Sequence, residues 1–260
     1  METPSNRFKR AIAEQRRQIG LWSSSGSAAA VEMLGPAGYD WILLDTEHAP
    51  SELPDIIAQM RVLTDSTAEP IVRPAWNDAV LIKRFLDAGA RTLLVPFVQN
   101  EREAVQAVRA MRYPPHGIRG VSVSSRANRY GRVTDYFGRV HDELCLLVQI
   151  ETRAALENLE LIAAVDGVDG IFIGPSDLAA DLGHLGNPGH PDVQAAIHSA
   201  VERCRAVGKA AGTLAPVEDD ARRYLEWGYT FVAIGADMGL LRKAADELLA
   251  RFRHRETQTG

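Results

Sequence analysis

Hydrophobic and polar residues along this chain form two alternating patterns. Short runs rich in Val, Ile, Leu and Phe predict buried strands, and the longer stretches between them, with apolar residues three and four positions apart, predict amphipathic helices. The predicted strands are 18–22, 41–47, 70–76, 92–98, 144–151, 170–175, 209–215 and 230–236. The predicted helices lie within 52–63, 78–89, 101–113, 152–165, 192–208, 217–228 and 239–252. This alternation is typical of parallel strands joined by crossover helices.

The number of strand and helix units favours a closed barrel. Several predicted helices end in glycine, at Gly89, Gly208 and Gly228, where a helix C-terminus favours a left-handed residue. Eight units in about 250 residues match the size of a (β/α)8 TIM barrel. A doubly wound open sheet is the alternative, but no GxGxxG motif follows the first strand and no second-domain boundary is evident. We therefore expect one α/β domain over 1–260, with a solvated tail from about 254.

One connection does not fit the repeating pattern. Residues 112–135 are rich in Gly, Pro and Arg and form a segment too long for a plain crossover. Such a segment is either a surface excursion or a functional element, here a lid or a subunit contact. The sequence leaves both interpretations open.

Charge and composition limit the possible partners and the location. The formal charge is −5, from 29 basic and 34 acidic residues, so no basic surface is expected to bind nucleic acid. Cys145 and Cys204 are not paired as in a CxxC motif and are predicted to be buried thiols in a reducing compartment. The N-terminus lacks the apolar core of a secretory signal, and no run approaches the ~20 apolar residues of a membrane span. These features predict a soluble, cytoplasmic protein that acts on a small molecule.

Candidate chemistry is concentrated where the predicted strands end. In a TIM barrel the active site lies at the C-terminal ends of the strands. The polar or large residues at these ends are Trp22, Asp45, Glu47, His48, Arg73, Gln149, Glu151, Ser176 and Asp177. Glu151 and Asp177 follow adjacent strands, about 4.8 Å apart, so they could share a divalent cation in oxygen coordination. A salt bridge from Arg73 to one of them is the alternative, because unpaired buried charges are costly.

Three further residues suggest how protons and charge are handled. His48 follows Asp45 by three positions, so that carboxylate could orient the imidazole for proton transfer, although a structural histidine is the alternative. Arg73 lies in an apolar strand and is a candidate to hold a carboxylate or a developing enolate oxygen, with a structural clamp as the alternative. Lys209 opens its strand and is predicted to lie at the opposite end of the barrel, which argues against a Schiff-base mechanism.

Longer motifs add a resemblance to a known family. They are YDWILLDTEHAP (39–50), IVRPAWND (71–78), TLLVPFVQN (92–100), RYPPHGIRGV (112–121), LVQIETRAAL (147–156) and VDGIFIGPSDLAADLG (168–183). Together they cover much of the chain and resemble the HpcH/HpaI family of metal-dependent 2-oxo acid aldolases, in the pyruvate/phosphoenolpyruvate-binding barrel superfamily. The resemblance implies reversible retro-aldol cleavage of 4-hydroxy-2-oxo acids to pyruvate and an aldehyde, in the breakdown of aromatic compounds or sugar acids.

The resemblance also implies roles for individual residues. Glu151 and Asp177 would bind Mg²⁺, Mn²⁺ or Co²⁺, without an organic cofactor. Arg73 would contact the keto or enolate oxygen, and His48, paired with Asp45, would transfer protons.

Other positions are implied to bind the substrate or to belong to an assembly. The backbone N–H groups of Ser176 and Asp177 would hold the substrate carboxylate, with Gln149 nearby, and Trp22 and Leu214 would line the aldehyde end. Many relatives read GPAD where this chain reads GPSD, so Ser176 adds a hydroxyl group there. Asp87 would approach the site of a neighbouring subunit in a homohexamer, built as a trimer of dimers that exchange the last helix.

Two other functions remain as alternatives. A CoA-ester lyase of the malyl or citramalyl type would share the barrel but needs a surface for the CoA arm. A non-catalytic barrel that binds 2-oxo acids would have no need for a proton-transfer group such as His48.

Overall fold

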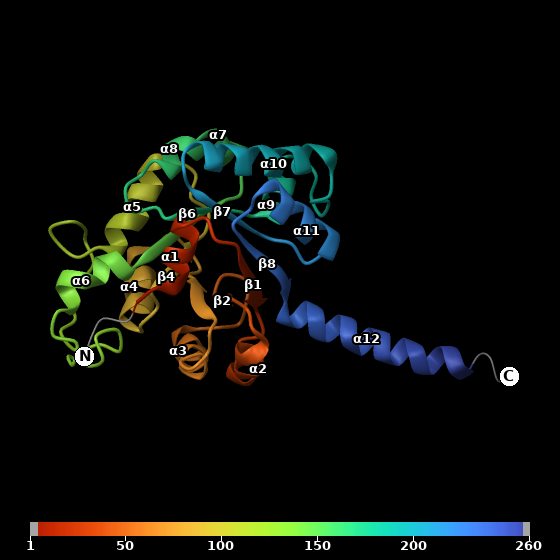
Figure 1. Ribbon diagram of the computed structural model, residues 1–260, viewed down its shortest axis with the longest axis horizontal. Coiled ribbons are helices and arrows are strands. Elements are labelled where there is room, and N and C mark those ends of the chain that lie inside the picture. Colours follow the sequence, from red (N-terminus) through yellow and green to blue (C-terminus); the bar gives the residue numbers. More distant parts are fainter. Residues whose placement is uncertain (1–4, 257–260) are drawn as a thin grey trace.

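Eight parallel strands close into a barrel, as the alternating pattern predicts. The structure is a computed structural model that describes residues 5–256 (Figure 1). The strands are β1 (Gln18–Ser23), β2 (Trp41–Asp45), β3 (Glu69–Arg73), β4 (Thr92–Val95), β5 (Cys145–Ile150), β6 (Gly170–Ile173), β7 (Ala210–Leu214) and β8 (Phe231–Ala236). They pair in sequence order, and β8 pairs with β1. The predicted TIM barrel is therefore confirmed.

Helices surround this barrel and include some that periodicity did not reveal. They are α1 (Arg7–Ala13), α2 (Ala28–Leu34), α3 (Leu53–Val62), α4 (Ala79–Asp87), α5 (Glu101–Met111), α6 (Tyr136–Glu143), α7 (Arg153–Glu157), α8 (Leu159–Ala163), α9 (Pro175–Asp181), α10 (Pro191–Ala206), α11 (Glu218–Trp227) and α12 (Asp237–Glu256), with a 3₁₀ turn, η1 (Gly35–Ala37). The predicted stretch 152–165 is two short helices that meet at Asn158. Helices α1, α2, α6 and α9 were not predicted; each has eight residues or fewer, so its pattern spans little more than two turns.

Several predicted strands were too long at their C-terminal ends. The run 92–98 is a strand only to Val95, and the run 41–47 only to Asp45. After β4 the chain stays apolar because the loop there is also buried: Val98 is inaccessible, and its N–H donates to the carbonyl of Gln149. Burial without strand geometry explains the error in that run, whereas Thr46 and Glu47, after β2, are polar and only partly buried.

Aromatic side chains fill the barrel from its N-terminal end. The rings of Trp41 and Phe231 lie in the interior, and the ring of Phe8 on α1 packs edge-on against both, with centroids 6.1 Å and 5.6 Å away. A Cβ atom at Gly20 would lie 2.1 Å from the Trp41 ring, and one at Gly212 would lie 2.0 Å from the Phe231 ring. Glycine at these positions therefore makes room for the two rings, and α1 closes this end of the barrel.

Two predictions about individual residues are confirmed by the packing. Gly89, Gly208 and Gly228 have φ angles of +100°, +71° and +103°, the left-handed conformation expected where helices end. Cys145 and Cys204 are buried free thiols, and burial raises the pKa of both.

The segment 112–135 is irregular and connects α5 to α6. Its Arg119 side chain is fully buried, donates to Asp87 at 2.7 Å and lies over the ring of Tyr113. Val121 and Val123, in contrast, are exposed by 61% and 74%. The segment is therefore held against the end of α4 through Arg119, Arg126 and Ala127 and presents apolar side chains to its surroundings, which is compatible with both predicted roles.

Helix α12 projects away from the barrel (Figure 1). Its start is held at the C-terminal end of β1, where Asp237 accepts hydrogen bonds from Ser23 Oγ and from the N–H groups of Ser24 and Ser25. The helix continues to Glu256, past the predicted start of the tail at about 254, and 257–260 lie outside the described residues. None of the described helices is long and apolar enough to cross a membrane.

Candidate active site

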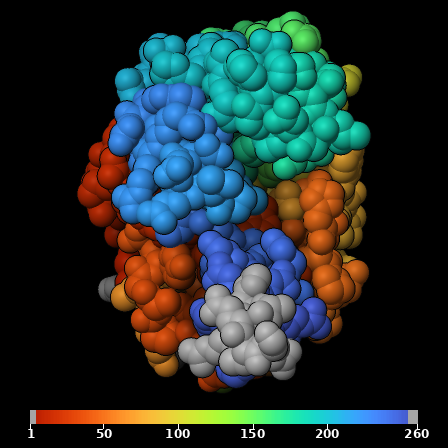
Figure 2. Space-filling model, turned by 90° about the vertical axis from the view of Figure 1, so that its right-hand side faces the viewer, coloured from red at the N-terminus to blue at the C-terminus, as the bar shows by residue number. Residues whose placement is uncertain are grey.

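The acidic and basic residues predicted from the strand ends do meet at the C-terminal end of the barrel. This end faces the side from which α12 projects, where the surface is hollowed between the cyan-to-blue helices of the C-terminal half and the orange α2 and α3 (Figure 2). Lys209 lies at the opposite end, immediately before β7, and its Nζ donates to the carbonyl of Val168. The prediction that no strand-end lysine reaches the site is confirmed for this residue.

Asp45 and Arg73 form a buried ion pair across β2 and β3. The two residues are register partners, and Nε and Nη2 of Arg73 donate to the two Asp45 oxygens at 2.8 Å and 2.6 Å. Trp22 Nε1 donates to Asp45 Oδ2 at 3.2 Å, and the guanidinium carbon of Arg73 lies 4.8 Å from the Trp22 ring centroid. Burial opposes ionisation of Asp45, but hydrogen bonds and the charge of Arg73 outweigh it and hold its pKa below the usual value.

His48 is not paired with Asp45, which corrects one expectation. Both Asp45 oxygens accept from Arg73, and Oδ1 also accepts the N–H of Glu47 at 3.0 Å. Within 5–256, no hydrogen bond joins His48 to Asp45, and the imidazole is exposed. The pairing fails because residues three apart at the end of a strand need not point the same way, whereas Arg73 is fixed opposite Asp45 by the strand register.

Glu47 is a site residue to which the sequence analysis gave no role. Its Oε2 lies 2.7 Å from Nη1 of Arg73, so this arginine binds two carboxylates at once. Burial raises the pKa of Glu47, as does the negative charge of Asp45 and Asp177, while Arg73 and His48 oppose the shift. Its position two residues beyond Asp45, at the same strand end, was the available signal.

Glu151 is held rigidly in a buried position after β5. Gln149 Nε2 donates to its Oε1 at 2.6 Å, and the N–H of Phe97 donates to its Oε2 at 2.9 Å. Phe97 has a φ of +56°, an unfavourable angle for a non-glycine residue, and it directs this N–H towards Glu151. A Cβ at Gly174 would lie 2.8 Å from Cγ of Glu151, so glycine is needed where β6 ends beside it.

The electrostatics of Glu151 show that the acids lie close together. Burial raises its pKa to about 7, and the neighbouring charges of Glu47 and Asp177 add to the shift. Asp177 is the third residue of α9 and is exposed, unlike Glu151. The site therefore contains four neighbouring carboxylates, of which Asp45 and Glu47 form ion pairs with Arg73.

The other predicted site residues occupy different environments. Gln149 is buried, and its Oε1 has no hydrogen-bond partner in the described part of the chain. Ser176 is exposed beside Asp177, Trp22 is buried under Arg73, and Leu214 is partly buried at the end of β7. Asp87 lies at the end of α4, the helix that leads into the N-terminal end of β4, and is not part of the site in its own chain. Its contribution to a neighbouring subunit stays a prediction.

The raised pKa of Glu151 predicts a pH-dependent cost in stability for the metal-free protein. Because the folded pKa of about 7 exceeds the ordinary glutamate pKa of 4.5, the folded protein binds more protons than the unfolded chain between these values. Stability should therefore fall as pH rises through this window, by up to about 3 kcal/mol. Glu151→Gln removes the charge but also one acceptor for Phe97, so we expect a net gain of about 1–2 kcal/mol at pH 8 and none at pH 4.5.

Thermal unfolding of both proteins with chelator at pH 4.5 and pH 8 measures this difference. Glu69→Gln is the matched control, because Glu69 is also buried but is paired with Arg91 at 2.6 Å at the other end of the barrel. That variant should lose stability at pH 8. A Glu151→Gln protein that melts below the wild type at pH 8 would contradict the assignment.

The closed parallel barrel, with acidic residues at the C-terminal ends of its strands, places this protein among the TIM-barrel enzymes. Comparison with known proteins identifies its family. The family model "HpcH/HpaI aldolase/citrate lyase" matches residues 18–244. The chain belongs to this family. The expectation drawn from the sequence motifs is thereby confirmed.

Individual relatives cover almost the whole chain. A "5-keto-4-deoxy-D-glucarate aldolase" from Enterobacter is 54% identical, over 95% of this chain and 97% of its own length. A "4-hydroxy-2-oxo-heptane-1,7-dioate aldolase" from Klebsiella pneumoniae is also 54% identical, over 98% and 97%. The solved structure of an HpcH/HpaI aldolase/citrate lyase family protein from Burkholderia cenocepacia superimposes with a TM-score of 0.93 at 39% identity, covering 96% of this chain and 100% of that one.

Proposed function

We propose that this enzyme is a divalent-metal-dependent, class II aldolase that cleaves 4-hydroxy-2-oxo acids to pyruvate and an aldehyde and catalyses the reverse addition. The observation that carries the proposal is the excess of acidic groups at the site: Asp45 and Glu47 pair with Arg73, whereas the neighbouring Glu151 and Asp177 form no ion pair among the described residues. Relatives named as aldolases, at 54% identity over nearly the whole chain, support the reaction type.

The set of donor atoms fits a divalent cation. Glu151 and Asp177 would hold Mg²⁺, Mn²⁺ or Co²⁺, because carboxylate oxygens are preferred by such ions and the charge excess needs compensation. A bound cation would stabilise the negative charge that develops on the keto oxygen of the substrate. The reaction needs no organic cofactor.

Arg73 is preorganised to receive the same developing charge. Its Nε and Nη2 are fixed by hydrogen bonds to Asp45, and its Nη1 pairs with Glu47 at 2.7 Å without hydrogen-bond geometry, so both terminal nitrogens retain hydrogens to donate. A donor that is already held in place stabilises an enolate oxygen without reorganising during the reaction. Asp45 thus acts through Arg73, as a positioning residue, rather than through His48.

The remaining residues would handle the proton and the substrate carboxylate. His48 is exposed at the end of β2, beside Glu47, and an imidazole nitrogen there can remove the C4 hydroxyl proton during cleavage. The backbone N–H groups of Ser176 and Asp177 would bind the carboxylate, as in the family. Trp22 and Leu214 would line the aldehyde end.

The alternatives are less well supported. Relatives named as aldolases do not favour a CoA-ester lyase of the malyl or citramalyl type, although the family also includes citrate lyases. A barrel that only binds 2-oxo acids would not require the energetically costly burial of Glu151 beside two other acids. The natural aldehyde remains open, since relatives with two different names are equally similar in sequence.

The exposed last helix supports a homohexameric assembly. Leu241, Leu248 and Phe252 on α12 are exposed by 66%, 50% and 66%, which is unusual for large apolar residues on one helix. A trimer of dimers that exchange this helix would cover them. In that assembly Asp87 and the 112–135 segment would approach the active site of a neighbouring subunit. We also propose that the enzyme works in the cytoplasm.

Pyruvate release provides the direct test. We expect the purified enzyme to release pyruvate from 4-hydroxy-2-oxo acids when Mg²⁺ or Mn²⁺ is present, to stop after chelation, and to recover when metal is returned. Malyl-CoA and citramalyl-CoA serve as the comparison substrates. Cleavage of a CoA ester in preference to every 4-hydroxy-2-oxo acid would favour the lyase alternative, and no turnover of either would favour the binding protein.

A further inference from the structure

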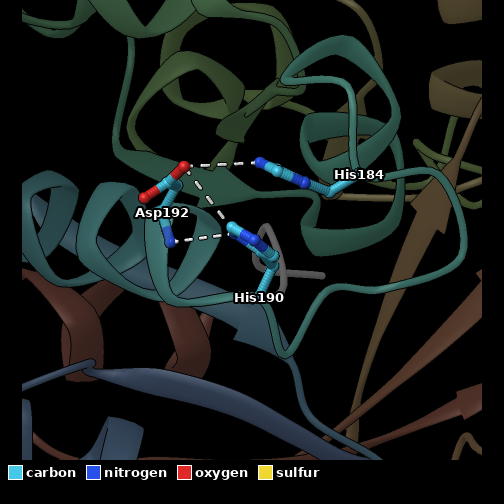
Figure 3. A group of neighbouring side chains, drawn as sticks. All are labelled: His184, His190 and Asp192. Carbon is cyan, nitrogen blue, oxygen red and sulfur yellow. Dashed lines mark hydrogen bonds and ion pairs between the residues drawn. The ribbon is translucent and has the colours of Figure 1, made fainter.

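Three side chains with metal-binding groups converge outside the barrel, where the segment after α9 joins α10. His184 lies in that segment, His190 is the N-cap of α10, and Asp192 is in its first turn. One ligand atom from each residue lies within 4.8 Å of the others, and the two stacked imidazoles both face Asp192 (Figure 3). None of the three belongs to the candidate active site.

The distances are close to those of a tetrahedral metal site. Nε2 of His184 lies 3.5 Å, and Nδ1 of His190 lies 3.8 Å, from Oδ2 of Asp192. Zinc bonds of about 2.0–2.2 Å at tetrahedral angles place two ligand atoms about 3.4 Å apart. Each imidazole nitrogen therefore lies within a few tenths of an ångström of the spacing to Asp192 that a shared ion requires.

The two imidazoles lie face to face, and both approach the carboxylate of Asp192. Their rings are stacked, with centroids 3.5 Å apart and planes 13° from parallel, so their in-plane lone pairs run side by side and one ring must turn before both can bind the same ion. Nδ1 of His190 accepts the N–H of Asp192 at 3.2 Å, which requires an unprotonated nitrogen directed towards Asp192. A cation bound there would displace this weak capping hydrogen bond. It would also be repelled by the positive end of the α10 dipole, and the negative charge of Asp192 reduces that repulsion.

The surroundings allow an ion to enter. The side chains of His184 and His190 are 24% and 32% exposed, and Asp192 is 76% exposed. His184 and Asp192 line an open cavity of about 320 Å³ between α7, α9 and α10. Water can therefore supply the remaining ligand.

We propose that His184, His190 and Asp192 form a second divalent-metal site, selective for imidazole-binding ions such as Zn²⁺ and distinct from the oxygen-only acids Glu151 and Asp177. Imidazole nitrogen suits Zn²⁺, Ni²⁺ and Cu²⁺, whereas Mg²⁺ prefers oxygen. Zn²⁺ at this position cross-links the segment after α9 to the start of α10 and so stabilises the connection that follows the helix carrying Asp177.

A calorimetric titration of the full-length enzyme with Zn²⁺, in a large excess of Mg²⁺, tests the site. We expect one Zn²⁺ per chain to bind to the wild type through imidazole and to raise its unfolding temperature. His184→Ala should lose this binding, and so should His190→Asn, which removes the imidazole but keeps a good helix N-cap. His198→Ala is the matched control, because His198 approaches Glu202 at 3.9 Å on the same helix but has no third ligand among residues 5–256.

Cobalt supplies a readout that needs neither the variants nor turnover. Paramagnetic Co²⁺ bound at this site should broaden the imidazole proton signals of His184 and His190 in the wild type and leave those of His198 sharp. Two results would overturn the proposal: no Zn²⁺ binding to the wild type in the presence of excess Mg²⁺, or Zn²⁺ binding to His184→Ala with the same affinity as to the wild type. Because Mg²⁺-dependent pyruvate release is measured separately, failure here leaves the aldolase proposal intact, and the converse also holds.

Discussion

Glu151→Gln and Asp177→Asn should each reduce metal-dependent cleavage by ~10³-fold or more, because removing a ligand removes the several kcal/mol of charge stabilisation that a bound cation supplies. Glu151 has no substitute: its two oxygens are fixed by Gln149 and Phe97, and Gly174 packs against its side chain. Pyruvate release at several Mn²⁺ concentrations measures the loss, and calorimetry with Mn²⁺ measures the affinity.

Asp181→Asn is the control for this result. Asp181 is also an acid on α9, but its Oδ2 accepts the N–H of Arg153 at 2.7 Å, and it is not one of the proposed ligands. That variant should retain turnover. Ordinary Mn²⁺-dependent activity in Glu151→Gln would remove the basis for the proposed metal site.

Glu151→Gln also links stability to function. The same substitution is expected to stabilise the metal-free protein at pH 8 and to inactivate the enzyme, because burying an ionised carboxylate beside Glu47 and Asp177 is costly unless a cation compensates it. A site that is unfavourable for folding and suited to metal binding is typical of a trade-off between stability and activity.

The sequence was sufficient to predict which residues meet at the site, because the fold brings them together. Parallel strands in a closed barrel all end at the same rim, so an acid after β5 and another after β6 must be near neighbours. The alternation of apolar runs and amphipathic stretches fixed the number of strands. From these two facts, the positions of Arg73, Glu151 and Asp177 followed.

The sequence could not show which charges pair with each other. Spacing along the chain suggested that Asp45 orients His48, but register across β2 and β3 places Arg73 opposite Asp45. The role of Glu47 and the left-handed conformation of Phe97 depend on loop geometry beyond the strand ends, which periodicity does not encode. Short apolar elements such as α1 were missed for the same reason: their burial depends on distant rings rather than on local pattern.

His48→Ala should lose aldol cleavage by the ~10²–10⁴-fold typical of general acid–base catalysis, with metal affinity nearly unchanged. The side chain is exposed and makes no hydrogen bond among the described residues, so the variant should fold normally. Arg73 requires more care, because Arg73→Ala would leave Asp45 buried without its partner. Arg73→Lys keeps a positive charge but cannot hold Asp45 and Glu47 together while donating to the substrate, so it is the better variant.

Oxaloacetate decarboxylation separates the roles of these two residues. It forms the pyruvate enolate by loss of CO₂ and requires no removal of a hydroxyl proton, whereas aldol cleavage requires both. His48→Ala should therefore keep decarboxylation better than cleavage, by at least about tenfold. Arg73→Lys should lose both activities to a similar extent, since both create charge at the oxygen that Arg73 stabilises. Equal losses of both activities in His48→Ala, with Mn²⁺ still bound, would show that this histidine does not act on the C4 hydroxyl proton.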